Sequence, residues 1–287
     1  MDIKQAITDK IIALLEKGNC SSSAPWAQAA GKGMPCNAVT GAAYRGVNVL
    51  ILWSEAVERG YTSNIWMTFK QAQALGGQVR KGEKAVLCAF FDKVKKSAKN
   101  AAEKSEAEGG EDSFFLCKPF WLFNLAQVEN LPADLTAVPV AATPDFNPIA
   151  EAEQILRASG ASIAHGFDGA FYSPSKDQIC LPERERFTSE VRYYATAMHE
   201  LSHWTGHENR LARDFSGRFG SEAYAFEELV AELGSAFLAG HIGFVDTTIE
   251  NHAAYLQSWL KVLKSDKTAI FTAASAASKA TDFVLAC

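Results

Sequence analysis

Two histidines and a glutamate in the C-terminal half of this chain have the spacing of a metal site. His199 and His203 lie four residues apart in the stretch RYYATAMHELSHWTGHENR, so on a helix they share one face, one turn apart. That spacing lets both imidazoles bind a single Zn²⁺ ion. Glu200 is rotated by about 100° from His199, where its carboxylate can take a proton from an attacking water and pass it to a leaving amine. We interpret the two histidines as metal ligands and Glu200 as the catalytic residue.

A zinc ion held by two histidines needs a third protein ligand. His207 follows one turn later, but a continuous helix would separate it from His199 by about 12 Å, too far for a shared ion. The string His-Glu-x-x-His-x-x-Gly is similar to the metzincin pattern, yet the position of the third metzincin histidine is Asn209 here,. The third ligand is therefore expected elsewhere in the chain.

The stretch YAFEELVAELGSAFL is the better source of that ligand. Glu228 and Glu232 share one helix face, and the small Ala231 and Ser235 permit close helix packing. The arrangement is similar to that of thermolysin-like gluzincins, in which a glutamate ligand lies on a second helix and an acid one turn later orients a histidine. By that resemblance Glu228 is the third ligand and Glu232 the orienting acid, while Glu227 stays open as a rival ligand. The expected ion is Zn²⁺, with Mn²⁺ or another divalent ion as an alternative.

Helical patterns surround the motif and would position it. The helix that carries it is expected over residues 188–206, with Thr188 or Ser189 as its N-cap and Gly206 at its end. The other elements expected in this half are helices over 149–159, 221–240, 248–264 and 268–285, with two short strands around a Ser-Pro turn in 170–182.

The first half mixes helices and strands. Helical periodicity is expected over residues 2–17, 47–59 and 68–75, and strands over 85–94 and 114–124. A proline-containing stretch then marks a linker. The sequence thus predicts an α+β fold with two domains: an N-terminal α+β domain over 1–130, a linker over 131–147, and a mostly helical domain over 148–287.

Charge is distributed unevenly between the two halves. The chain carries a net charge of −5 over 287 residues, but residues 1–99 hold 14 Lys and Arg against 7 Asp and Glu, while residues 131–287 hold 12 against 20. A basic front half and an acidic back half suggest different partners for each. No stretch reaches the roughly 18 apolar residues of a membrane span, and the N-terminus does not read as a signal peptide. We therefore expect a cytoplasmic protein without a membrane partner.

The basic front half interleaves aromatic and basic residues with glycine and asparagine. Proteins hold single-stranded DNA by stacking bases on aromatic rings and by lining the phosphates with positive charge, and hydroxyls and backbone amides also contact phosphates. The candidate single-stranded-DNA contacts are Trp26, Asn37, Thr40, Tyr44, Arg45, Asn48, Trp66, Thr68, Arg80, Lys81 and Lys84.

The order of the motifs along the chain is similar to one known family. The motifs are Pro35-Cys-Asn37, Thr40-Gly41, Tyr44-Arg45-Gly46, Val79 to Lys84, Tyr172-Ser-Pro174, His199 to Gly206 and Glu227 to Glu232. In this order the chain resembles the ArdC family of plasmid antirestriction proteins, which is related to the N-terminal region of TraC-type primases. The resemblance implies an N-terminal single-stranded-DNA-binding domain and a C-terminal zincin-like metallopeptidase domain. It also implies a bacterial, plasmid-encoded protein that protects incoming conjugative DNA from restriction endonucleases or is transferred with it.

The sequence is consistent with two different functions. In the first, the chain is a zinc peptidase that cleaves a protein, for example a restriction endonuclease subunit. In the second, it is a non-catalytic module that coats single-stranded DNA, and the metal only shapes the fold. Salt-dependent DNA binding and loss of cleavage in a Glu200 variant would distinguish the two readings.

Overall fold

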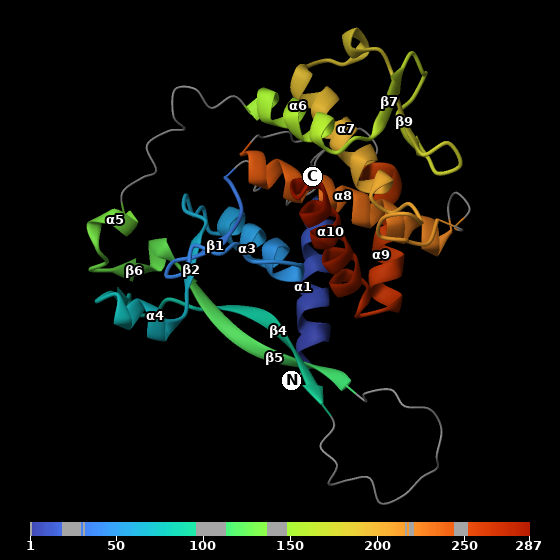
Figure 1. Ribbon diagram of the computed structural model, residues 1–287. Helices are drawn as coiled ribbons and strands as arrows, with labels where there is room; N and C mark the ends of the chain where they lie inside the picture. The colour runs from blue at the N-terminus through green and yellow to red at the C-terminus, as the bar shows by residue number, and fades with distance from the viewer. Residues whose placement is uncertain are drawn as a thin grey trace, which may run out of the picture.

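A computed structural model gives the fold of residues 2–18, 30, 32–95, 113–136, 148–215, 217, 221–243 and 252–287. Helices and strands are mixed, so the predicted α+β class is confirmed (Figure 1). Trp26 and most of the predicted linker lie outside the described residues. Within the described residues no helix is both long and apolar enough to cross a membrane.

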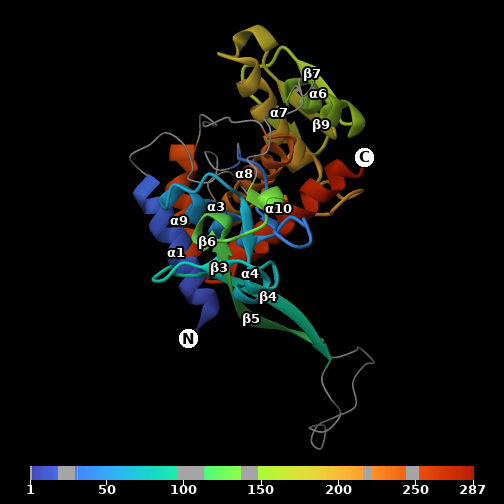
Figure 2. The same ribbon diagram turned by 90° about the vertical axis from the view of Figure 1, so that its left-hand side faces the viewer.

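The first half of the chain is built on a four-stranded sheet. Its strand order is β1-β2-β5-β4, and the long β4–β5 pair runs antiparallel from Val86 opposite Leu122 to Lys95 opposite Ser113 (Figure 2). A second, two-stranded sheet pairs β3 with β6. The strands are β1 (Cys36–Asn37), β2 (Ile65–Met67), β3 (Gln78–Val79), β4 (Val86–Lys95), β5 (Ser113–Asn124) and β6 (Val128–Glu129).

Helices accompany this sheet, and α3 contacts its edge strand β4. The helices are α1 (Ile3–Gly18), α3 (Val47–Glu58), α4 (Phe69–Ala74) and α5 (Ala133–Thr136), with the short 3-10 turn η2 (Leu125–Gln127). The Asn48 side chain of α3 accepts a hydrogen bond from the Ala89 backbone N–H at 2.9 Å and donates to the Ala89 carbonyl at 2.8 Å. Because β4 is an edge strand, Asn48 occupies backbone groups that no further strand pairs with there,.

The second half begins with a helix and a three-stranded sheet. α6 (Pro148–Ala158) precedes β7 (Ser162–His165), β8 (Phe171–Ser173) and β9 (Gln178–Leu181), whose order is β7-β9-β8. β8 and β9 are the two strands predicted around the Ser-Pro turn, whereas β7 was not expected. The 3-10 turn η3 (Arg184–Arg186) then leads into the helix that carries the metal motif.

Two long helices, α7 (Glu190–Trp204) and α8 (Glu222–Ile242), carry the candidate site. Each begins at a serine whose hydroxyl accepts a backbone hydrogen bond: Ser189 from Arg192 and Ser221 from Tyr224,. α8 ends at Gly243, which has a left-handed φ of 70° that glycine adopts without strain,. The sequence therefore predicted both helices to within two residues at each end.

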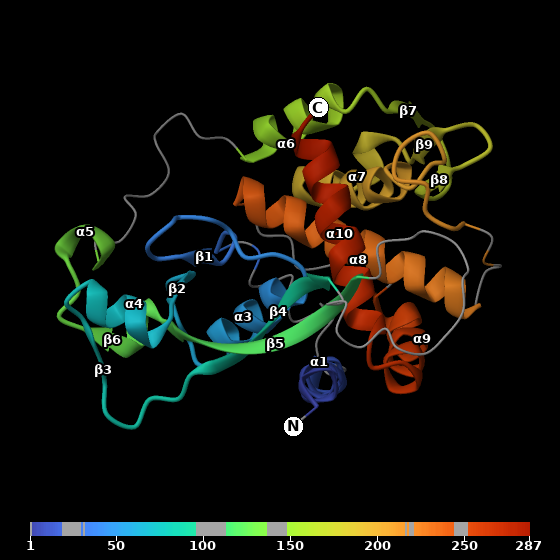
Figure 3. The same ribbon diagram turned by 60° about the horizontal axis from the view of Figure 1, so that its bottom comes forward.

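The largest hydrophobic core joins both halves of the chain. Residues of α1, α3, β4 and β5 pack in one cluster with residues of α8, α9 (His252–Ser265) and α10 (Ala269–Leu285). Trp53 of α3 is completely buried, and its ring lies 5.9 Å from that of Phe237 in α8. A Cβ atom at Gly240 would lie 2.8 Å from the Trp53 ring, so glycine is required for this close approach. Figure 3 looks along α1 and shows β5 and α9 beside it.

Candidate metal centre

Small side chains let α7 and α8 approach each other closely. A Cβ atom at Gly234 would lie 2.6 Å from the Ser202 hydroxyl oxygen, and the Ser235 hydroxyl donates to the Ala195 carbonyl at 3.2 Å. Ala231, about one turn before these two residues on α8, is completely buried. The packing agrees with the small residues expected on this face, although the tightest contact is at Gly234. The close approach brings the acidic face of α8 over the two histidines of α7.

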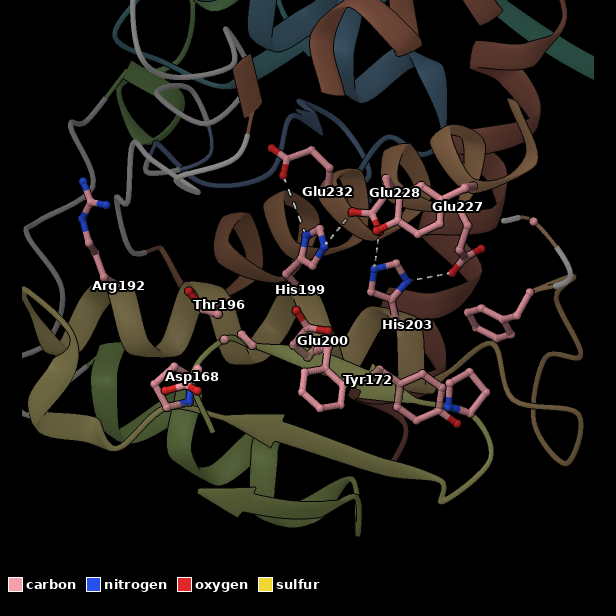
Figure 4. A pocket seen from close by; sticks show the side chains of 18 of the residues that line it. Asp168, Tyr172, Arg192, Thr196, His199, Glu200, His203, Glu227, Glu228 and Glu232 are labelled. Carbon is pink, nitrogen blue, oxygen red and sulfur yellow. Dashed lines mark hydrogen bonds and ion pairs between the residues drawn. The ribbon is translucent and has the colours of Figure 1, made fainter. Parts of the chain in front are cut away.

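The Glu228 carboxylate faces both imidazole rings (Figure 4). Its Oε2 lies 3.5 Å from His199 Nε2, and its Oε1 lies 3.6 Å from His203 Nε2. One ligand atom from each of the three residues falls within 4.8 Å of the other two. The structure thus brings together the three residues proposed as ligands, and the register places Glu228, rather than its rival Glu227, between the rings.

The other nitrogen of each histidine faces an outer carboxylate. Glu227 Oε1 lies 3.1 Å from His203 Nδ1, a hydrogen bond. Glu232 Oε2 lies 3.9 Å from His199 Nδ1, beyond hydrogen-bond length, and that buried nitrogen has no hydrogen-bond partner,. Glu232 is therefore near the histidine that it was expected to orient but does not bond to it. The hydrogen bond comes from Glu227, on the neighbouring position of α8.

The chemistry of this donor set fits a divalent ion. Two imidazoles and one carboxylate that leave a position open are the set typical of catalytic zinc sites. The Nε2 atoms of His199 and His203 converge on Glu228 at 3.5 and 3.6 Å, longer than a typical N–H···O hydrogen bond,. Buried polar atoms normally have partners, so the convergence is better explained by a shared cation than by direct bonding among these groups.

Glu200 lies on the wall of a cavity of about 610 Å³ that the three candidate ligands also line. Its side chain is buried, and burial raises the pKa of Glu200, while His199 and His203 act in the opposite direction. Tyr172 of the edge strand β8 lines the same cavity and gives Glu200 a backbone hydrogen bond. A carboxyl group with a raised pKa beside an open ligand position is suited to accepting and returning a proton.

Metal binding here should depend on pH. Burial is the largest influence on the pKa of His199 and lowers it, but the carboxylates of Glu228, Glu200 and Glu232 together raise it to about 9. Only a neutral imidazole binds a metal, so below that pKa an incoming ion must displace the His199 proton. The affinity for Mn²⁺ should therefore rise about tenfold per pH unit between about pH 6 and about pH 8. Titration calorimetry in buffers of different ionisation enthalpy would test this; a constant affinity with no proton release would contradict it.

Two supporting residues were missed by the sequence reasoning. Tyr224, one turn before Glu228 on α8, hydrogen-bonds to that carboxylate and helps to lower its pKa, although burial acts to raise it. Arg213 binds Glu227 from the loop after α7. The spacing of Tyr224 and Glu228 could have suggested the first contact. No pattern signals the second, because Arg213 lies in an irregular segment.

The candidate DNA contacts in the first half occupy several kinds of position. Asn37 accepts from the Thr40 backbone and donates to the Tyr44 hydroxyl at 3.0 Å, so these three residues hold one loop together. Arg45 is exposed and pairs with Asp282 of α10. Arg80 pairs with Glu83, while Lys81 and Lys84 are exposed.

One candidate DNA contact is corrected, and two others have side chains that hold the fold. Trp66 is completely buried, so its ring has no face on which a base could stack. Asn48 uses its amide to hold the Ala89 backbone. Thr68 is the N-cap of α4 and accepts from the Gln71 backbone. Each reads as polar or aromatic in a basic sequence, but each serves the fold.

A strip of aromatic side chains on β5 and α4 is exposed instead. Trp121 is 53% exposed and Phe69 is 50% exposed. Phe123 lies two residues after Trp121 and therefore on the same face of β5, and its ring is 6.3 Å from that of Phe69. We call Phe69, Phe123 and Trp121 the aromatic strip.

Known proteins match this chain along nearly its whole length. Residues 1–123 match the family described as the N-terminal domain of anti-restriction factor ArdC, and residues 150–276 match a zincin-like metallopeptidase family. The metal-free crystal structure of the antirestriction ArdC protein from plasmid R388 has 39% sequence identity and a TM-score of 0.82, covering 99% of this chain and 97% of that one. The chain belongs to the ArdC antirestriction family. The Mn(II)-bound structure of the same protein gives 38% identity and a TM-score of 0.80, covering 100% of this chain and 98% of that one.

Other relatives extend the ArdC-family match. The uncharacterized protein y4eC of Sinorhizobium fredii is 39% identical over 285 residues, which are 99% of this chain and 91% of that protein. Two DNA primases TraC of Escherichia coli are each 39% identical over 98% of this chain, but the match spans only 20% and 27% of their lengths. The ArdC-family chain therefore corresponds to a small part of each primase.

Proposed function

We propose that this chain binds single-stranded DNA and protects incoming conjugative plasmid DNA from host restriction endonucleases, and that it carries a zinc-dependent peptidase-type site. The observation that carries the proposal is the convergence of His199, His203 and Glu228 beside Glu200. Its context is a chain that aligns with 97% of an antirestriction protein. A cytoplasmic location in a bacterial host, with restriction endonuclease subunits as protein partners, belongs to the same proposal.

In the peptidase-type site, His199, His203 and Glu228 would hold the ion. When bound, a divalent ion supplies Lewis acidity, which polarises a carbonyl oxygen and eases deprotonation of water. Glu200 would accept the proton of the attacking water and return it to the leaving amine. Zn²⁺ is the ion that we favour because of the donor set; the Mn(II)-bound ArdC structure supports a divalent ion in this family.

A Glu200→Gln variant tests the enzymatic part of the proposal. The amide cannot accept a proton, so cleavage should fall about 10²- to 10⁴-fold, while Mn²⁺ binding should be retained because Glu200 is outside the candidate ligand set. The measurement uses denatured casein and purified restriction endonuclease subunits as probes, with and without a single-stranded oligonucleotide. If the wild-type chain leaves every probe intact, the peptidase assignment is wrong.

If the wild-type chain cleaves no probe, the alternative function applies: the chain is a non-catalytic module that binds single-stranded DNA, and the metal stabilises its fold. The same two proteins then answer a second question in cells that carry a type I restriction system. If Glu200→Gln protects an incoming unmodified plasmid as well as wild type does, protection depends on binding. If only the wild-type chain protects, protection depends on proton transfer at Glu200.

The aromatic strip is our candidate surface for single-stranded DNA. Each base that stacks on an aromatic ring contributes about 1–3 kcal/mol, so Trp121→Ala should weaken oligonucleotide binding about fivefold or more. Phe90 of β4 is 55% exposed and pairs with Lys118 of β5. Lys118 lies three positions before Trp121, so Phe90 and Trp121 lie on opposite faces of the sheet. Phe90→Ala is therefore the matched control. Fluorescence anisotropy with a labelled oligonucleotide would measure both, and equal losses would contradict the assignment to this face.

A further inference from the structure

The loop from Thr205 to Phe215 folds back on the end of α7. The Leu211 N–H donates to the Thr205 carbonyl at 3.0 Å, and the Arg213 N–H donates to the Gly206 carbonyl at 2.8 Å. A Cβ atom at Gly206 would lie 2.6 Å from the Phe215 ring and 2.8 Å from Arg213 Nη2. Glycine at this position therefore allows the loop to close on itself beside His203.

Two arginines of equal burial fix this loop on opposite sides. The side chains of Arg210 and Arg213 are each 11% exposed. Arg210 donates to Asp177 in the turn after β8, and its guanidinium lies 3.8 Å from the centre of the Trp204 ring. Arg210 therefore holds the loop against the small sheet.

Arg213 holds the other side of the loop against the metal centre. Its Nε lies 3.0 Å from Glu227 Oε2, and its Nη2 lies 2.8 Å from Glu227 Oε1. Further donors reach the Thr205 hydroxyl at 2.8 Å and the Ser202 carbonyl at 2.6 Å. These contacts use both ends of the planar guanidinium, which a lysine ammonium would not reproduce.

The same Glu227 oxygen joins Arg213 to His203. Glu227 Oε1 accepts from Arg213 Nη2 at 2.8 Å and lies 3.1 Å from His203 Nδ1. His203 and Glu227 are buried and the Arg213 side chain is only 11% exposed, so the arginine offsets a carboxylate charge that would otherwise be costly there. An ionised carboxylate only accepts hydrogen bonds, which requires His203 to donate from Nδ1. In the neutral ring that binds a metal, the other nitrogen, Nε2, then carries the lone pair, and it is this nitrogen that faces Glu228,.

We propose that Arg213 is a positioning residue of the metal centre, which acts through Glu227 to fix the ring orientation and tautomer of His203. This inference rests on the proposed metal site but not on peptidase activity. His199 lacks an equivalent support, because Glu232 stays 3.9 Å from its Nδ1. The support is therefore specific to one of the two histidines.

The test compares full-length variants loaded with Mn²⁺ or Co²⁺. Partners that orient a ligating histidine typically account for 10- to 100-fold in metal affinity, so Arg213→Met should weaken Mn²⁺ binding by about that factor and alter the Co²⁺ visible spectrum. Arg210→Met is the matched control, since Arg210 belongs to the same loop, has the same side-chain exposure as Arg213, and pairs with Asp177 instead of with a carboxylate that contacts a histidine. It should leave the Co²⁺ spectrum unchanged and the Mn²⁺ affinity within about threefold of wild type.

A double variant separates positioning from stability. Arg213→Met with Glu227→Gln leaves no unpaired buried charge and so avoids the main reason for misfolding. If Arg213 acts through Glu227, the double variant should bind Mn²⁺ as weakly as Glu227→Gln alone. Additive losses, an equal loss in Arg210→Met, or an unchanged Co²⁺ spectrum in Arg213→Met would each overturn the inference. Failure of the wild-type chain to bind either ion would instead overturn the proposed metal site.

Discussion

A His203→Ala variant is expected to bind Mn²⁺ and Zn²⁺ about 100-fold or more weakly than the unaltered chain, a larger loss than removing an orienting partner causes. The substitution removes one of three converging donors and leaves Glu227 without its histidine partner. A bound ion raises the melting temperature of a protein that binds it only when folded. The wild-type chain should therefore melt at a higher temperature with Mn²⁺ than without, and the variant should show no such difference.

His207 supplies the matched control for this experiment. It lies one turn beyond His203 in sequence, but its Nδ1 accepts from the Asn209 backbone at 3.3 Å, and it is not part of the cluster of ligand atoms. His207→Ala should therefore keep the affinity of the wild-type chain. Equal losses in the two variants would mean that the ion binds elsewhere among the histidines of this region.

Trp53→Ala is expected to destabilise the metal-binding half as strongly as the half that contains it. Removing a completely buried tryptophan costs about 3–5 kcal/mol, and the cavity would open against Phe237 and Gly240 of α8. Because one core joins both halves, the denaturant midpoint measured by circular dichroism and the midpoint of Mn²⁺ release should fall together.

Trp121 provides the comparison, since it is also a tryptophan of the first half but is 53% exposed. Trp121→Ala should change stability by about 0.5 kcal/mol or less. Release of Mn²⁺ at an unchanged midpoint in Trp53→Ala would contradict a shared core. A truncated chain of residues 1–130 is accordingly a poor test of DNA protection, because it would expose the apolar surface that α8, α9 and α10 cover.

Local sequence patterns predicted most of the helices and strands and the three candidate metal ligands. His199 and His203 lie one helical turn apart, and Glu228 shares a face with Glu232, so periodicity alone was sufficient to bring these groups into consideration. The helix ends were also predictable, because serine caps and glycine stops act over a few residues. β7 was missed because its sequence, Ser-Ile-Ala-His, is short and does not alternate apolar and polar residues,.

Contacts between distant segments were not predictable in the same way. Arg213 reaches Glu227 from an irregular loop, and Arg45 pairs with Asp282 across 237 positions of sequence. Trp66 is an aromatic residue in a basic segment, which suggested base stacking, yet the fold buries its side chain completely. Amino-acid composition shows which side chains a segment contains. Their burial and their partners depend on which helices and strands pack together, and this packing leaves no periodic pattern in the sequence.

The contact between Asn48 and Ala89 bears on self-association of the protein. An uncovered edge strand invites a second copy of the same chain to add its own strand, which leads to self-association. Asn48 interrupts the row of free donors and acceptors along β4 by occupying both backbone groups of Ala89. If many copies bind one incoming DNA strand, the Asn48 amide would hinder pairing between the β4 strands of neighbouring molecules. Each copy could then dissociate by itself.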